Sequence, residues 1–199
     1  MRYDCRAGLD AARWSAGVTR TLAGRAWVTI AGSAGRASGV VSRGEVALEY
    51  GRGLTFDSRR PVRGVEVTLH ARRLWFDAAD VVTLTPGALF YLPRDWTVSV
   101  SVTAARSRFP ELGTAWRPAS LTRLNAPIGA RVVGQVFVAS GTENFALADQ
   151  IGRFSARTVG AGVRIQVADG KDVLGYVARQ ARTQGRTQTS AGMGYVLRF

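Results

Sequence analysis

The side chain best suited to acid–base chemistry in this sequence is His70, the only histidine among 199 residues. A histidine can activate a serine nucleophile, and Ser99 or Ser101, two strands away in an interior, could in principle be its partner. His70 nevertheless lies mid-strand in an alternating stretch with no serine nearby in sequence. We therefore predict a histidine hydrogen-bonded to interior neighbours such as Glu66, and we do not expect an enzyme.

Metal, redox and nucleotide chemistry find little support in the residues. Cys5 is the single cysteine, so the sequence has neither a disulfide framework nor a cysteine metal site. Gly160 and Gly162 resemble part of a nucleotide-binding loop, but they lie inside an alternating segment with no helix after it. We interpret them as positions where small residues face an interior, and we predict no cofactor.

Arginine dominates the charge of the chain. There are 27 basic residues against 14 acidic ones, and every basic residue except Lys171 is an arginine. Arginine suits bidentate contact with phosphate or carboxylate, but these arginines are scattered, with no basic run longer than two. A nucleic-acid footprint is normally a patch or stripe, so we expect no nucleic-acid partner. Arginines inside a barrel, or at a rim facing lipopolysaccharide phosphates, fit the scatter better.

The composition indicates strands rather than helices. The hydrophobic fraction is 46%, yet no stretch approaches the roughly 20 apolar residues that a transmembrane helix needs. Twenty-three glycines and many Val, Thr and Ser residues are typical of strands joined by turns. The predicted fold class is all-β, with a single domain over residues 1–199.

The last twelve residues form the most informative strand. Alternate positions back from the end place Phe199, Leu197, Tyr195 and Met193 on one face. Apolar residues at every second position before an aromatic final residue resemble the C-terminal signal by which outer-membrane barrel proteins are recognised for assembly. We therefore predict that Tyr195, Leu197 and Phe199 form an assembly signal.

Earlier segments repeat this alternation, most clearly at 96–104 and 159–167. A tilted membrane-spanning strand needs roughly 9 to 11 residues, and the second segment reaches that length. Weaker alternation toward the N-terminus brings the total to about 12 strands, with about 10 as the alternative. The predicted architecture is an antiparallel up-and-down transmembrane β-barrel.

The connections between these strands alternate in length. Short connections are expected at 92–95, 125–129 and 168–172, and longer ones at 106–113, 140–153 and 183–187. Outer-membrane barrels have short periplasmic turns and longer outer loops, and the pattern agrees when it is counted back from Phe199. The connection from Gly51 to Pro61 is an exception. Aromatic residues expected near strand ends, as in interfacial girdles, are Trp14, Trp27, Trp75, Trp96, Trp116, Tyr50, Tyr91, Tyr176 and Tyr195.

If the apolar faces meet lipid, the charged residues must face the interior, because an arginine at the bilayer mid-plane costs roughly 2 to 4 kcal/mol. The early part of the inward set contains all of its acidic residues and the late part most of its arginines, so we expect acids and bases on opposite walls, either as a salt-bridge network or along a polar passage. The predicted lumen-lining residues are Glu45, Glu49, Glu66, His70, Arg72, Arg131, Gln135, Arg164, Gln166, Arg179 and Arg198.

The sequence resembles the YaiO family of outer-membrane β-barrel proteins. The resemblance rests on 81–96, where Thr85-Pro86-Gly87 precedes an aromatic pair, a short turn and Trp96, and on the closing strand at 185–199; it covers 44–199. It implies a porin-like barrel in the outer membrane of a Gram-negative cell envelope, with a structural or transport role linked to surface polysaccharide. The partners implied are outer-membrane lipids, lipopolysaccharide, the barrel assembly machinery and an anionic polysaccharide.

A soluble β-barrel that binds an anionic ligand is the alternative. It is motivated by the high basic charge and by the first residues, Met1 to Cys5, which contain no apolar secretion segment. The genomic sequence upstream of Met1 discriminates between the two hypotheses, because a leader or a periplasmic region in frame there would remove the main support for the soluble barrel.

Overall fold

The computed structural model describes residues 2–6, 9–35, 42–57, 59–77, 79–109, 113–143, 154–182 and 187–197. Within these ranges side chains are described except at 2–13, 109, 113, 115, 142–143 and 154–155. The strands described are β1 (Arg2–Arg6), β2 (Leu9–Leu22), β3 (Ala26–Gly35), β4 (Gly44–Thr55), β5 (Gly64–Trp75), β6 (Asp80–Tyr91), β7 (Thr97–Phe109), β8 (Gly113–Pro127), β9 (Val132–Glu143), β10 (Phe154–Ala168), β11 (Lys171–Arg182) and β12 (Gln188–Leu197).

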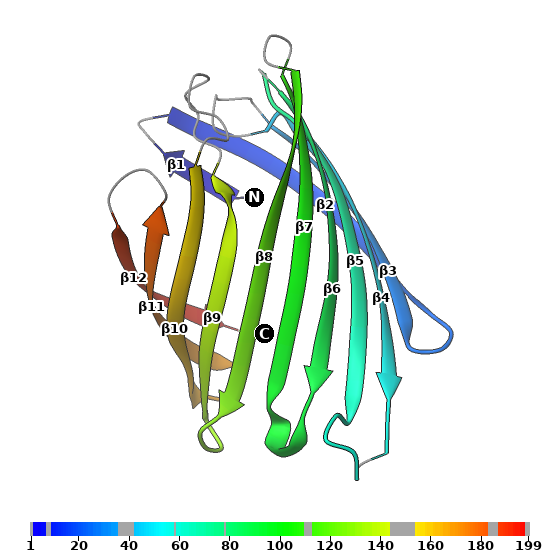
Figure 1. Cartoon of the computed structure of the whole chain (residues 1–199), viewed down its shortest axis with the longest axis vertical. Coiled ribbons are helices and arrows are strands. Elements are labelled where there is room, and N and C mark those ends of the chain that lie inside the picture. The colour runs from blue at the N-terminus through cyan, green and yellow to red at the C-terminus, as the bar shows by residue number, and fades with distance from the viewer. Residues whose placement is uncertain are drawn as a thin grey trace.

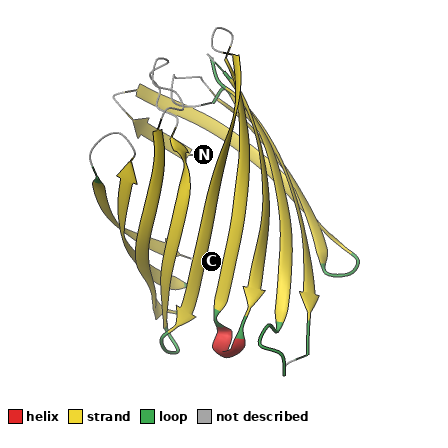
Figure 2. Ribbon diagram, viewed as in Figure 1, coloured by secondary structure: helices red, strands yellow, loops and turns green. Residues whose placement is uncertain are grey.

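These strands form one antiparallel sheet in which each strand pairs with its neighbours in sequence. Figure 1 shows the sheet curled into a tapering, barrel-like wall. Helix is almost absent from the described residues, apart from one 3₁₀ turn at Pro93–Asp95 (Figure 2). No ladder joins β1 to β12 within the described ranges, so the sheet has two edges. The predicted all-β, up-and-down antiparallel sheet is confirmed, and its closure into a barrel stays a prediction.

The connections fall at two ends of the sheet. The end at which β12 finishes, termed the turn end, carries the connections 23–25, 56–63, 92–96, 128–131 and 169–170. The opposite end, termed the loop end, carries 7–8, 36–43, 76–79, 110–112, 144–153 and 183–187. The predicted short connections all lie at the turn end, and the exception there is the eight-residue connection 56–63.

One predicted long connection, 106–113, is wrong. Strand β7 continues to Phe109 and β8 begins at Gly113, so only three residues separate them. Arg106 and Arg108 pair with Trp116 and Thr114 across the hairpin. The charged residues at the end of this strand were interpreted as a loop. Pairing between strands uses backbone groups only, so charged side chains are compatible with it where they reach solvent. The predicted turn at 125–129 is also displaced, because β8 runs to Pro127.

The register sorts side chains onto two faces. The apolar face carries the alternate positions that include Val18, Ile30, Leu48, Leu69, Leu84, Val100, Val102, Leu124, Val136, Val138, Val159, Val177, Met193, Tyr195 and Leu197. The polar face carries the other set, with a row that runs Thr19, Thr29, Glu49, His70, Thr85, Thr103, Ala119, Gly141, Ala156 and Arg182.

The apolar face is the more exposed of the two. Leu48 and Val102 are each 48% exposed, whereas the side chain of Glu45 on the polar face is 12% exposed. The buried hydrophobic residues among those described are alanines, namely Ala26, Ala156 and Ala178. Among the described residues the sheet therefore has no buried core of large apolar side chains, and its polar face is the less exposed of the two.

Aromatic rings packed over glycines line the polar face. A Cβ atom at Gly51 would overlap the ring of Trp27 on the neighbouring strand. The same relation holds between Gly160 and Phe137 and between Gly192 and Tyr176. Gly160 and Gly162 both lie on this face, as predicted. Glycine at these positions lets a large ring lie flat against the wall, which is the arrangement known to rescue strand glycines.

Gly160→Val should lower the free energy of unfolding by about 1 to 3 kcal/mol, the usual cost of overpacking a tight site. The added Cβ would meet Phe137 and would lie 3.0 Å from the carbonyl oxygen of Val177. Guanidinium titration of the protein refolded in detergent micelles measures the change. The matched control is Gly175→Val on the apolar face, where the nearest atom to the added Cβ is Val163 Cγ1 at 3.9 Å. Equal losses in the two variants would contradict the packing described here.

Candidate functional site: the polar face of the sheet

Most of the predicted interior residues lie together on the polar face. Strands β4 and β5 contribute one group and β9 and β10 the other, and the residues are Glu45, Glu49, Glu66, His70, Arg72, Gln135, Arg164 and Gln166. Alternation within each strand was sufficient to place these residues, because the residues next to them in sequence, which lie on the other face, are almost all apolar. That they line a closed lumen stays a prediction.

Arg179 and Arg131 do not join this group, and Arg198 lies outside the described residues. Arg179 pairs with Val159 and Thr189 and lies on the apolar face, so its predicted interior position is wrong. Strand β11 has Val173 and Val177 on one face and Leu174 and Tyr176 on the other, and only the register with β10 decides which is interior. Arg131 lies in the exposed turn between β8 and β9.

The predicted assembly signal is described in part. Tyr195 and Leu197 lie on the apolar face and are 55% and 49% exposed. Phe199 and Arg198 lie outside the described residues. The described part of the last strand therefore presents the apolar side chains that the sequence pattern predicts.

An ion pair joins β4 to β5 on the polar face. Arg72 Nε donates a hydrogen bond of 2.6 Å to Glu45 Oε1, and the Nη2 atom of Arg72 contacts the same carboxylate. The two residues are diagonal neighbours, because Arg72 pairs directly with Ala47 and Glu45 pairs with Leu74. The pair is partly buried, and this protects it from screening by salt.

A second ion pair joins β10 to β11 close to the turn end. Arg164 donates two hydrogen bonds to Asp172 Oδ2, from Nε at 3.1 Å and from Nη2 at 2.7 Å. Asp172 is only 1% exposed. The prediction missed Asp172 because it read this residue as part of the 168–172 turn, whereas the turn is residues 169–170 and Asp172 is already in the strand.

These two pairs correct the prediction that acids and bases lie on opposite walls. Arg72 lies among the early acidic residues and Asp172 among the late basic ones, and each ion pair joins adjacent strands. Local pairing follows from strand geometry, since directly opposed and diagonal residues lie within about 5 to 8 Å of each other. Charges held in this way along the wall can leave the centre free.

His70 lies between Glu49 on β4 and Thr85 on β6, its direct cross-strand partners. Neighbouring strands lie about 4.8 Å apart, so Ser101 on β7 is roughly 10 Å from β5. A nucleophile and its base must approach to about 3 Å. Thr85 Oγ1 is instead 2.9 Å from Thr103 Oγ1, which forms a hydroxyl pair beside the histidine. The predicted hydrogen bond between His70 and Glu66 is not present among the described residues.

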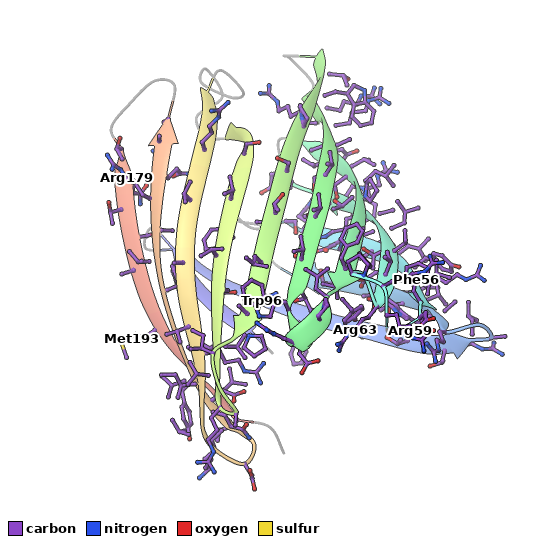
Figure 3. All side chains as sticks on the ribbon, turned by 60° about the horizontal axis from the view of Figure 1, so that its bottom comes forward. Phe56, Arg59, Arg63, Trp96, Arg179 and Met193 are labelled. Atoms are coloured by element: carbon purple, nitrogen blue, oxygen red, sulfur yellow. The ribbon has the colours of Figure 1, made fainter. Side chains whose placement is uncertain are left out.

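A recess of about 440 Å³ opens at the turn end of the polar face, between β3 and β6. Arg25 and Arg63 line it together with Trp27, and Tyr91 Oη donates a 3.3 Å hydrogen bond to Glu66 Oε2 at its wall. Figure 3 shows Arg63, Arg59 and Phe56 gathered at the β4–β5 connection. The recess offers guanidinium donors of the kind that bind phosphate or carboxylate.

Sequence reasoning missed Arg25 and Arg63, because each lies outside the alternating segments. Arg25 follows Gly24 in the tight β2–β3 turn and has a φ angle of 59°. Its Nη1 atom donates a 2.7 Å hydrogen bond to Thr55 Oγ1 on β4, which a single strand's pattern cannot show. The sequence signal that could have identified them is that both arginines lie in turns that an up-and-down topology places at the same end of the sheet.

A second recess of about 380 Å³ lies over β7 to β11. Small and neutral side chains line it on the polar face, among them Ser101, Thr103, Thr158 and Gln180. Hydroxyl and amide groups can exchange hydrogen bonds with water or with sugar hydroxyls. The polar face thus combines a neutral wall on one side with paired charges on the other.

Metal binding and helical membrane spans find no support in the described residues. No three of their His, Cys, Asp and Glu side chains come close enough to hold a metal ion. The described residues form no helix that is long and apolar enough to cross a membrane. Comparison with known proteins finds no family model and no curated sequence that matches the chain.

Proposed function

We propose that this protein is an outer-membrane β-barrel of the YaiO type, closed by β1 and β12, with a structural or transport role at the cell surface. The turn end then faces the periplasm and the loop end faces outward. A link to surface polysaccharide is part of the proposal and rests on the sequence resemblance alone. The proposal includes no catalytic role, in keeping with the strand that separates His70 from the nearest interior serines.

The inverted distribution of polarity carries this proposal. Large apolar side chains such as Leu48, Val102 and Val138 are about half exposed along alternate positions, while paired charges lie on the enclosed face. Soluble monomers rarely expose contiguous apolar patches larger than a few hundred Å². Lipid is the solvent that makes such a surface favourable.

Strand length and aromatic placement agree with this reading. Strands β2 to β12 contain 10 to 15 residues, enough for a tilted strand to cross the hydrocarbon layer. On the apolar face Trp14, Trp75 and Trp116 lie near the loop end and Tyr195 lies near the turn end, and Trp96 lies in the turn between β6 and β7 at that same end. Trp27, Tyr91 and Tyr176 instead lie on the polar face, so the girdles that we propose are built from the other aromatic residues.

A soluble barrel that binds an anionic ligand is disfavoured by the same distribution. It would need its large apolar side chains packed inside, yet the buried hydrophobic residues among those described are three alanines. The arginine-lined recess at the turn end supplies the anion-binding capacity of that alternative without requiring a soluble protein.

Fractionation tests the proposal most simply. The chain, fused to a cleavable secretion signal and expressed at a low level in a Gram-negative host, should fractionate with outer membranes. It should also migrate faster on gels before boiling than after, because a closed barrel resists detergent at room temperature. A periplasm-targeted soluble β-protein provides the control. Recovery of the chain as a soluble monomer with no heat-dependent mobility would overturn the proposal.

A further inference from the structure

The apolar face contains a recess of about 410 Å³ across β8 to β11. Leu124, Val136, Val138, Val159 and Val177 line it, and Ala161 is the small residue between them. Directly below it, Gly134 and Gly175 flank Val163. The small side chain of Ala161 between these valines leaves a shallow groove on the apolar face, and the side chain of Ile128 lies over Gly134 at its turn-end side.

A pair of arginines stands at the loop-end limit of this groove. Arg179 pairs with Val159, and Arg157 pairs with Ala181, so the two arginines are diagonal neighbours on the apolar face. Both are exposed, and neither forms an ion pair or hydrogen bond with another described residue. Figure 3 shows Arg179 at the outer edge of the wall, on the same side as Met193.

Two other arginines near the loop end of this face, Arg73 and Arg106, have partners, and Arg108 has the acidic Asp80 as its direct ladder partner. Arg73 forms a 3.3 Å ion pair with Asp80 and lies 5.2 Å from the ring centroid of Trp75. Arg106 lies 5.9 Å from the ring centroid of Trp116. A guanidinium directed toward lipid requires a counter-charge, and for Arg157 and Arg179 the described chain supplies none.

We propose that this groove binds the lipid A part of lipopolysaccharide, with an acyl chain along Val159 and Val177 and a phosphate between Arg157 and Arg179. The inference rests on the proposed membrane location, which places the loop end in the outer leaflet. Two adjacent guanidinium groups match a phosphate oxygen fork, and Thr189 beside Arg179 adds an exposed hydroxyl. A neutral lipid would use the groove but leave both charges uncompensated.

The test uses the full chain refolded in lipid nanodiscs, with purified bisphosphorylated lipid A as the probe. The variant Arg157→Gln/Arg179→Gln should bind it at least tenfold more weakly than the unaltered protein. The matched control, Arg20→Gln/Arg52→Gln, removes two exposed arginines from the same face near the turn end and should leave binding unchanged. Equal binding by both double variants would overturn the inference.

Two further arms separate the headgroup from the acyl chain. Dephosphorylated lipid A and phosphatidylglycerol should each bind more weakly than bisphosphorylated lipid A. The arginine substitutions should not change the affinity for dephosphorylated lipid A. Ala161→Leu should fill the groove and weaken binding several-fold, whereas Ala16→Leu, an exposed position on β2 of the same face, should not. Phosphatidylglycerol binding as tight as that of lipid A would contradict the choice of ligand.

The outcomes distinguish this inference from the proposed function. Each variant is first examined for heat-dependent gel mobility, so that only correctly folded protein enters the binding experiment. Failure of the unaltered chain to insert into bilayers would refute the membrane proposal. Insertion with lipid A binding that is indifferent to Arg157 and Arg179 would refute the lipid site alone.

Discussion

Val102→Arg should lower the free energy of unfolding in lipid vesicles by about 2 to 4 kcal/mol, because the proposed membrane location places residue 102 on the lipid face near the bilayer mid-plane, where a cationic side chain has this cost. Val102 lies near the middle of β7, pairs with Ser120 on β8 and is 48% exposed on the apolar face. Such a loss reduces the folded-to-unfolded ratio by a factor of about 30 to 1,000. Guanidinium unfolding in vesicles of short-chain phosphatidylcholine, followed by tryptophan fluorescence, measures it.

The adjacent residue provides the control for this prediction. Ser101 lies on the polar face and borders the neutral recess, so Ser101→Arg places the same charge where water can reach it. We expect its effect to be within about 0.5 kcal/mol, as for ordinary surface substitutions. If both arginines were tolerated equally, or if Ser101→Arg were the more damaging, the assignment of the two faces would be wrong.

Arg164→Ala should destabilise the protein by about 2 kcal/mol, because it removes two hydrogen bonds from a carboxylate that is almost completely buried. The figure lies below the 3 to 5 kcal/mol typical of a fully buried pair, since the Arg164 side chain is 47% exposed and part of the attraction is screened. The same vesicle titration measures it. Arg131→Ala, an exposed turn arginine nearby, should change stability by no more than about 0.5 kcal/mol.

A double variant shows whether the loss comes from the carboxylate that Arg164 leaves behind. Arg164→Met combined with Asp172→Leu removes both charges and should recover most of the stability lost in Arg164→Ala, as replacement of buried ion pairs by apolar residues usually does. A double variant less stable than Arg164→Ala would show that Asp172 contributes through contacts other than this pair.

The sequence predicts many strands of this fold well because they have two chemically different faces. In β7 the alternation of Val98, Val100 and Val102 with Ser99 and Ser101 predicts a strand with the valines on one face and the serines on the other, and the structure confirms both. The end of the same strand was mispredicted, since Arg106 and Arg108 look like loop residues in a one-dimensional pattern. Their pairing with β8 becomes visible only in the hairpin.

The candidate site was predictable only in outline, for a related reason. Glu45 and Arg72 were each placed correctly on the polar face, but their ion pair depends on the stagger between β4 and β5. Arg179 was misplaced because both faces of β11 contain apolar residues, so facing there depends on the ladder with β10. Arg25 and Arg63 lie in connections, where alternation carries no information.

The central claim, that the apolar face meets lipid and the polar face meets water, can be measured directly with spin labels. Single cysteines at positions 98 to 103, introduced one at a time in a Cys5→Ser background, place a nitroxide on alternate faces of β7. Collision with oxygen reports contact with lipid, and collision with a water-soluble nickel complex reports contact with water. In bilayers we predict high oxygen and low nickel accessibility at 98, 100 and 102, with the opposite at 99, 101 and 103. Nickel accessibility that peaks at 98, 100 and 102, or shows no two-residue period, would contradict the account.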